Sequence, residues 1–144
     1  MSADEVILGV INSFRTSYLR WRTLFEDLYF TTNRVIVAKI GSGSYLISPV
    51  GVLVRWPKTA KQEFVGFSAE ELLKANQNNF AIYYSEVRSV ELKKHGLGAK
   101  IRLITDEKKY EWYVRGIPGK KDAKIEDYES ILKTVFPNKL SVSK

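Results

Sequence analysis

Three arginines and a tryptophan form the most chemically suggestive cluster in the sequence, namely Arg15, Arg20, Trp21 and Arg22. A guanidinium group binds phosphate in a bidentate fork, and an indole ring settles at the interface between membrane and water. The cluster is therefore a candidate site for an anionic, phosphate-bearing ligand. The alternative interpretation places Trp21 in the core and leaves the arginines solvated.

A second candidate site consists of Arg55, Trp56 and Lys58, which directly follow the apolar residues 50–54. An indole ring beside apolar chain and two cations could enter a bilayer or the groove of a partner protein. The alternative interpretation is a buried strand followed by an ordinary loop.

Catalytic and metal chemistry finds little support. The chain has no cysteine, which excludes disulfides, thiolate nucleophiles and cysteine zinc sites. Its one histidine, His95, lies between two lysines and a glycine and is predicted to be a solvated turn residue without a partner for acid–base work. We predict no catalytic residue, no metal site, no cofactor and no enzymatic activity. The paired carboxylates are interpreted as a helix cap, a turn and a solvated helix face, at residues 70–71, 106–107 and 126–127.

Alternating apolar residues predict several strands. Residues 28–31 and 34–40 form a hairpin around Thr32 and Asn33, because Asn tolerates the positive φ of a tight turn. Residues 82–92 form a strand with a break near Ser85, and residues 101–105 and 110–114 flank a turn at 106–109. The first strand is expected to be irregular, interrupted at residues 12–13, although residues 6–28 also fit a helical spacing.

Two helices are expected in the remaining chain. Ser68 and Glu71 have the spacing of a capping box, which predicts a short helix up to residue 75. An apolar stripe predicts a final helix at 122–136, ended by Pro137 and followed by a short tail at 138–144. A chain of 144 residues fits one domain, here residues 1–137. The predicted class is mainly β (α+β), with about seven antiparallel strands capped by the final helix.

Three stretches of the sequence resemble the pleckstrin-homology-like (PH-like) superfamily, close to its GRAM and bacterial-type branches. They are residues 28–37, residues 80–92, and residues 100–114 with the final helix. The resemblance implies a barrel or sandwich with an insertion at about 41–79. It also implies a scaffold that binds lipid headgroups, peptides or proteins. In lipid-binding members a basic cluster often ends in Arg-x-Arg. Arg20-Trp21-Arg22 is similar to that ending, with Arg15 in place of the usual lysine and at a shorter spacing.

The formal charge of +7 and the sequence pI near 9.5 suit a polyanionic partner, or simply a solubilising surface. Between residues 15 and 61 the only acids are Glu26 and Asp27, against eight basic residues: Arg15, Arg20, Arg22, Arg34, Lys39, Arg55, Lys58 and Lys61. We therefore predict a binding or adaptor module for anionic lipid headgroups or membrane surfaces. The first alternative is a protein partner, and the second is a nucleic acid, for which the stacking rings would be Tyr29, Tyr83, Trp112 and Tyr113.

The location expected from the sequence is cytoplasmic, including a peripheral position at a membrane. Residues 1–5 are acidic and do not have the pattern of a secretory signal. The longest apolar stretch, residues 45–54, is far shorter than the roughly 20 residues that a spanning helix needs.

Overall fold

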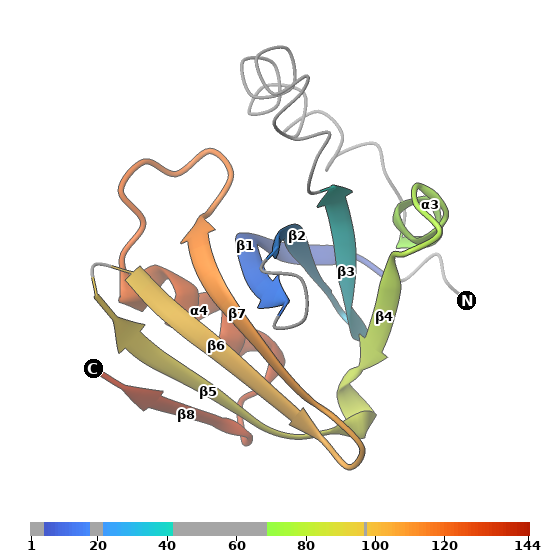
Figure 1. The fold of residues 1–144 in the computed structure, drawn as a ribbon. Helices are drawn as coiled ribbons and strands as arrows, with labels where there is room; N and C mark the ends of the chain where they lie inside the picture. The colour runs from blue at the N-terminus through green and yellow to red at the C-terminus, as the bar shows by residue number, and fades with distance from the viewer. Residues whose placement is uncertain (1–4, 18–21, 42–68, 97) are drawn as a thin grey trace.

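The computed structural model describes residues 5–17, 22–41, 69–96 and 98–144 (Figure 1). The described part contains one mixed sheet with the strand order β4-β3-β2-β1-β7-β6-β5-β8. The strands are β1 (Ile7–Ser17), β2 (Arg22–Thr31), β3 (Arg34–Gly41), β4 (Phe80–Tyr83), β5 (Val87–His95), β6 (Gly98–Thr105), β7 (Lys109–Gly116) and β8 (Leu140–Ser143).

The sheet consists of two halves that meet along β1 and β7. Strands β1 to β4 pair in chain order, as do β5 to β7, and all of these pairs are antiparallel. Among the described strands, pairing between the halves occurs only where Asn12–Phe14 of β1 lies beside β7. Figure 1 shows β3 and β4 on one side of the molecule and β5, β6 and β8 on the other, with β1 and β7 between them.

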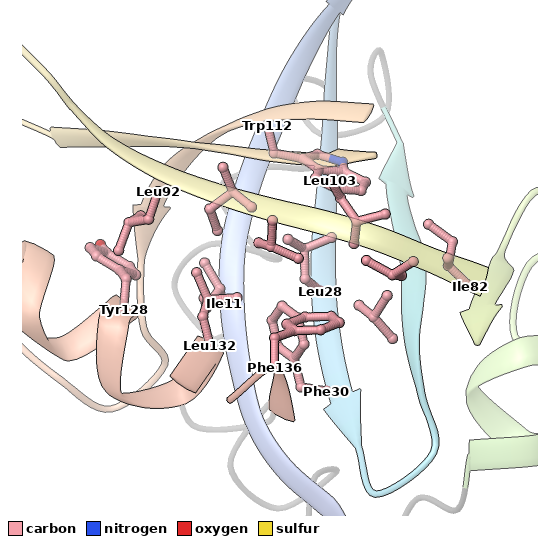
Figure 2. Close-up of a cluster of buried hydrophobic side chains, with 14 of the residues drawn as sticks. Ile11, Leu28, Phe30, Ile82, Leu92, Leu103, Trp112, Tyr128, Leu132 and Phe136 are labelled. Atoms are coloured by element: carbon pink, nitrogen blue, oxygen red, sulfur yellow. The ribbon is translucent and has the colours of Figure 1, made fainter. Parts of the chain in front are cut away.

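The main core lies between the two halves and is completed by α4 (Ile125–Val135). Tyr128 and Leu132 of α4, with Phe136 just beyond it, point toward buried residues of the strands (Figure 2). The sheet residues that they meet come from both halves and include Ile11, Leu28, Phe30, Leu92, Leu103 and Trp112. A helix of 11 residues is too short to persist alone, so this docking is what stabilises it.

A second, smaller core lies on the other face of β1, β2 and β3. It contains Val10, Tyr29 and Ile36 from the strands and Ala69 and Leu72 from the short helix α3 (Ala69–Lys74). The central strands are therefore covered on both faces. This explains why consecutive residues such as Tyr29 and Phe30 are both buried.

The main expectations from the sequence are confirmed. The described chain is mainly β with a C-terminal helix that completes the core. The hairpin turn lies at Thr32 and Asn33, and the break between β4 and β5 is a single 3₁₀ turn, η2 (Tyr84–Glu86). The short helix lies where it was expected, although Ser68, its predicted cap, is outside the described residues.

The turn between β2 and β3 has a different cause from the one expected. Among the described non-glycine residues only Asp122 has a positive φ, so Asn33 does not use the left-handed region. Instead the Thr31 hydroxyl accepts hydrogen bonds from the backbone N–H groups of Asn33 at 3.1 Å and Arg34 at 3.0 Å. These hydrogen bonds from the backbone of the turn to the Thr31 side chain stabilise the turn without a left-handed residue.

The sequence predicted an interruption of the first strand at Asn12 and Ser13, but β1 continues through both residues. The segment is a strand and not the alternative helix. Both polar side chains are satisfied across the ladder to β2. The Asn12 amide donates to the Asp27 carboxylate at 2.7 Å, and the Ser13 hydroxyl donates to the Glu26 carbonyl oxygen at 2.7 Å. The irregularity takes the form of register shifts, one at residues 7–9 against β2 and one at residues 12–13 against β7.

Two further differences concern the C-terminal part. The final helix begins at Ile125 and not at Asp122, because Asp122 has a φ of 57° and the Asp127 carboxylate accepts a hydrogen bond from the Lys124 backbone N–H at 2.7 Å. The expected tail contains β8, which pairs in parallel with β5. The Lys139 ammonium group anchors it by donating to the carbonyl oxygens of Tyr84 and Val87 at 3.0 and 2.6 Å.

No helix in the described parts of the chain is long and apolar enough to span a bilayer.

Leu132 tests the docking of α4. Its side chain is fully buried, so Leu132→Ala should lower the free energy of unfolding by about 2–5 kcal/mol, through lost apolar contact and a cavity. Ile131→Ala should cost less, because Ile131 is only partly buried. Urea denaturation of both variants measures the difference, and a loss below about 0.5 kcal/mol for Leu132→Ala would contradict the docking.

Candidate binding surface

The predicted arginine cluster lies at the end of the β1–β2 hairpin. Ser17 and Arg22 are opposite each other where the described ladder ends, and Arg15 lies two pairs further in, opposite Leu24. Arg20 and Trp21 lie outside the described residues, as do the three residues of the second candidate site, Arg55, Trp56 and Lys58. Of the two candidate sites, the structure therefore describes only the Arg15 side chain and the backbone of Arg22.

The Arg15 side chain is engaged by Glu26. Its Nη2 donates to Glu26 Oε2 at 3.0 Å, and its Nε lies 2.9 Å from Oε1. The same Oε1 accepts a hydrogen bond at 2.8 Å from the indole N–H of Trp112, which is fully buried. Glu26 is itself only 4 % exposed, so Arg15 neutralises a carboxylate inside the barrel and ties β1 to β2 and β7.

A row of side chains crosses five strands on the outer face of the sheet, beside this hairpin. The register places Lys93 opposite Lys100, Lys100 opposite Tyr113, Tyr113 opposite Phe14, and Phe14 opposite Phe25. The rings of Tyr113 and Phe14 stack with their centroids 5.3 Å apart, and Phe14 lies 6.3 Å from Phe25. We call these five residues the cation–aromatic row.

The row is basic at one end and aromatic at the other. The Lys100 ammonium nitrogen lies 5.9 Å from the centroid of the Tyr113 ring, and the exposed His95 ring lies 5.0 Å from it on the same side. Both lysines also lie within ion-pair distance of an acidic side chain. Lys93 Nζ is 3.8 Å from a Glu91 oxygen and Lys100 Nζ is 3.9 Å from a Glu111 oxygen, whereas Glu111 is held closely by Arg102 at 2.6 Å.

The cation–aromatic row was not found by sequence reasoning. Its members are spread from residue 14 to residue 113, and only the strand register brings them into line. The sequence signal was limited to alternation within each strand, which assigns a side chain to a face but not to a neighbour. His95, predicted in a turn, is the last residue of β5.

Asp27 lies on the opposite face of β2 from Glu26, because successive side chains of a strand alternate. Its Oδ1 accepts the hydrogen bond from Asn12 and lies 3.8 Å from Arg115 Nη2, while its buried Oδ2 has no hydrogen-bond partner. Burial raises the pKa of Asp27 to about 6, against the opposing effects of the Asn12 hydrogen bond and the Arg115 charge.

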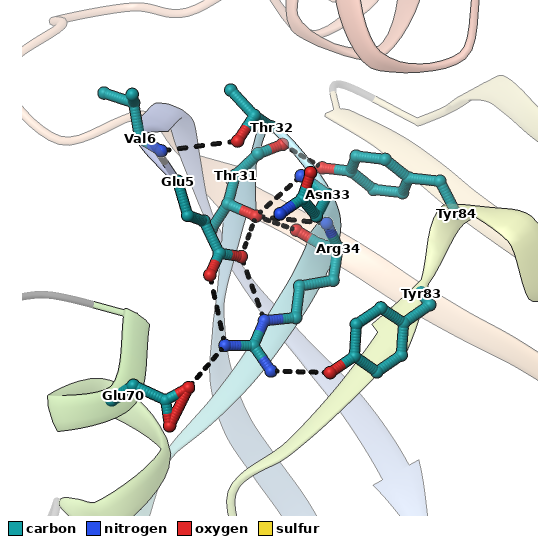
Figure 3. Close-up of polar contacts among 9 residues, drawn as sticks. All are labelled: Glu5, Val6, Thr31, Thr32, Asn33, Arg34, Glu70, Tyr83 and Tyr84. Carbon is teal, nitrogen blue, oxygen red and sulfur yellow. Dashed lines mark hydrogen bonds and ion pairs between the residues drawn. The ribbon is translucent and has the colours of Figure 1, made fainter. Parts of the chain in front are cut away.

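Arg34 is the centre of a network of ion pairs and hydrogen bonds that includes the buried Glu5 (Figure 3). Its Nε and Nη2 donate to the two oxygens of Glu5 at 2.9 and 3.2 Å, Nη2 also donates to Glu70 at 3.1 Å, and Nη1 donates to the Tyr83 hydroxyl at 3.0 Å. The Thr31 hydroxyl donates to Glu5 at 2.7 Å. Burial acts to raise the pKa of Glu5, but the hydrogen bonds from Arg34 and Thr31 outweigh it and lower the pKa.

This arrangement has a structural role, because all three nitrogens of the Arg34 guanidinium group are engaged in contacts with other parts of the protein. Arg34 begins β3, Glu5 precedes β1, Glu70 lies on α3 and Tyr83 ends β4. The pair therefore holds the N-terminal segment, the β2–β3 hairpin and the short helix together.

The described residues contain no group of three or more His, Cys, Asp or Glu residues that could hold a metal ion.

Of the four rings considered for base stacking, Tyr29 and Trp112 are buried and cannot reach a nucleotide. Tyr83 is exposed and Tyr113 is partly exposed, but they lie on different strands of the two halves.

Removal of Arg34 tests the structural role of its ion pair. Arg34→Ala should lower the free energy of unfolding by about 3–5 kcal/mol, because it leaves the Glu5 carboxylate buried without its partner. Tyr83→Phe removes one hydrogen bond of the same guanidinium group and should cost only about 0.5–1.5 kcal/mol. Equal losses in chemical denaturation would show that Glu5 does not depend on Arg34.

The raised pKa of Asp27 makes a prediction about pH. A buried carboxyl whose folded-state pKa exceeds its unfolded value favours the folded state at low pH, and this contribution is lost as pH rises from about 4 to about 6. Asp27→Asn removes that loss, so the variant should gain stability relative to wild type as pH rises, by roughly 3 kcal/mol between pH 4 and 7.5. Denaturation across this range measures the gain.

Asp127→Asn is the matched control. The hydrogen bond from the Lys124 backbone, followed by that from Lys120, lowers the pKa of Asp127, so its contribution is present above the unfolded pKa and lost as pH falls. Because that loss lies below the ordinary aspartate pKa of 3.8, the stability difference between this variant and wild type should be nearly constant between pH 4 and 7.5, in contrast to the gain of Asp27→Asn. A flat difference for Asp27→Asn would contradict the buried, poorly satisfied carboxyl.

Comparisons with known proteins bear on the fold. No protein-family model and no curated protein sequence matches the chain. A solved structure does match: the hSac2 domain from the human phosphoinositide phosphatase Sac2, with a TM-score of 0.52 and 12 % sequence identity, over 98 % of this chain and 78 % of that one. The hSac2 domain is a PH/GRAM-like domain. The likeness supports the expectation from the sequence, and the chain has a PH-like fold: a mainly β, mixed sheet with a C-terminal helix.

Proposed function

We propose that the protein is a non-catalytic binding module that attaches to anionic lipid surfaces through the end of its β1–β2 hairpin and the adjacent cation–aromatic row. The observation that carries the proposal is the row itself, because it joins two lysines and partly exposed rings on one face. Cations attract an anionic surface, and aromatic rings beside them favour the interfacial region.

The charge distribution supports the hairpin as the second contact. Residues 15–22 contain three arginines and no acid. Arg15 is occupied by Glu26, so we assign the lipid contact to Arg20 and Arg22, and Arg15 the task of fixing the hairpin to the barrel. Tyr113 pairs with Phe14 only three residues before Ser17, which brings the row and the hairpin end to the same region.

The description of the similar structure favours a lipid over other polyanions. The hSac2 domain belongs to a phosphoinositide phosphatase, a protein whose substrate class is an anionic lipid. A nucleic acid is less well supported, because two of the four candidate stacking rings are buried.

A vesicle sedimentation assay tests the proposal. Phosphatidylcholine vesicles with and without phosphatidylserine and phosphoinositide are compared at low and high salt. We expect binding only to the anionic vesicles, weakened by salt because exposed charges are screened. The double variants Arg20→Gln/Arg22→Gln and Lys93→Gln/Lys100→Gln should each weaken it by roughly tenfold or more, since each basic residue near the surface contributes about 1 kcal/mol.

Lys121→Gln/Lys133→Gln is the control, because it removes the same charge from exposed positions outside the hairpin and the row. It should retain most of the binding. An equal loss in the control would indicate attraction by net charge alone, and no binding to anionic vesicles at low salt would end the lipid proposal.

A further inference from the structure

Within the described residues, the first part of β1 has an open edge. Residues 7–11 pair with β2 on one side, while β7 pairs with β1 only at Asn12–Phe14. No described strand lies along the other side of residues 7–11. An open edge presents unpaired backbone N–H and C=O groups, which are a template for another extended chain.

An apolar groove of about 480 Å³ runs beside this edge. One wall is formed by Ile7–Val10 of β1 and the other by Ile117, Pro118 and Ile131. Leu8 is 46 % exposed at its rim, although it is a large apolar residue. Apolar residues therefore line the side of β1 with which no described strand pairs.

The groove follows the path that β7 would have taken beside β1. β7 ends at Gly116, opposite Asn12, and the chain then turns through Ile117 and Pro118, which line the groove instead of pairing with β1. Pro118 has no N–H group and so cannot donate to a strand in the groove. The β1 edge is thus the side of the groove that can form a hydrogen-bonded ladder.

Gly9 allows the β1 backbone to lie close to Ile131 of α4. A Cβ atom at this position would lie 3.0–3.3 Å from three side-chain atoms of Ile131, which is closer than ordinary contact. The β1 backbone therefore approaches α4 directly, and no side chain of residue 9 stands between the edge and an incoming chain.

We propose that this groove binds an extended, apolar segment of a partner protein, which adds to β1 as a new strand in the position that β7 vacates. Addition of a strand gains main-chain hydrogen bonds, while alternate side chains enter the apolar groove. Residues 7–11 carry no charge, while residues 119–124, which follow Pro118, contain three lysines against one acid, Asp122. Acidic residues flanking the apolar segment would complement them.

The groove shares no residue with the hairpin or the cation–aromatic row, so the two proposals can fail separately. The test uses a fluorescent peptide with a Val-Thr-Val-Thr-Val core between glutamates, followed by polarisation, with the full-length protein as the receptor. We expect saturable binding, with NMR amide shifts centred on residues 7–11, Ile117 and Ile131. The same peptide with alternate backbone nitrogens methylated on its pairing edge should not bind, because it lacks the donors for the ladder.

Leu8→Asp should weaken binding by about tenfold or more, because it places a carboxylate at the apolar rim. Val6→Asp is the control, since Val6 is similarly exposed at 55 % but does not line the groove. Equal weakening by both variants, undiminished binding of the methylated peptide, or no binding of the unmodified one would overturn the proposal. A dimer in sedimentation velocity that Leu8→Asp dissolves would also overturn it, since a second copy would then be the occupant.

Discussion

The narrow seam between β1 and β7 is the constraint on which the rest of the structure depends. Among the described strands the two halves of the sheet pair with each other only across Asn12–Phe14, so a short ladder joins two multi-stranded halves. Other interactions reinforce it. Trp112 crosses from β7 to Glu26 of β2, the Arg115 Nε donates to the Ser13 carbonyl oxygen at 3.3 Å, and α4 packs against both halves from inside.

The two acids of β2 contribute to the seam in opposite ways. Glu26 points inward, where the Arg15 guanidinium compensates its charge and the indole N–H of Trp112 donates a hydrogen bond to it. Asp27 points outward, where Asn12 binds one oxygen and the other has no partner. A buried charge stabilises a fold only when it is paired and hydrogen-bonded, so Glu26 fixes the seam and Asp27 weakens it at neutral pH.

Local signals explain what the sequence could and could not predict. The β2–β3 hairpin and α4 were predictable, because two β-rich runs flank Thr32 and Asn33, and an apolar stripe precedes Pro137. Strand β8 was missed because Leu140 and Val142 alternate with serines over only four residues, too short a run to distinguish from a tail. The first strand was predicted correctly as an irregular strand, but the break expected at Asn12 and Ser13 is absent because Asp27 and Glu26 satisfy these two side chains.

The candidate sites also differ in whether local sequence signals could predict them. The arginines of the hairpin could be chosen from their types and spacing, but nothing in the sequence showed that Arg15 is committed to Glu26. The cation–aromatic row depends on the register of β1, β5, β6 and β7, which is a property of the assembled sheet. Pairwise register carries information that no single segment contains.

The edges of the sheet differ in how they are protected, and this difference singles out the groove. β4 is four residues long and ends at Tyr83, which is bound by Arg34, while the edge of β5 is covered by β8. Short edges and covered edges resist unwanted pairing. No described strand covers this side of residues 7–11 of β1, and these residues carry no charge that would repel another strand. Because β7 diverges at Gly116, the same turn that shortens the seam leaves this edge open beside apolar walls. Among the described strands, a chain added beside residues 7–11 would continue the β1–β7 ladder in the same direction along β1.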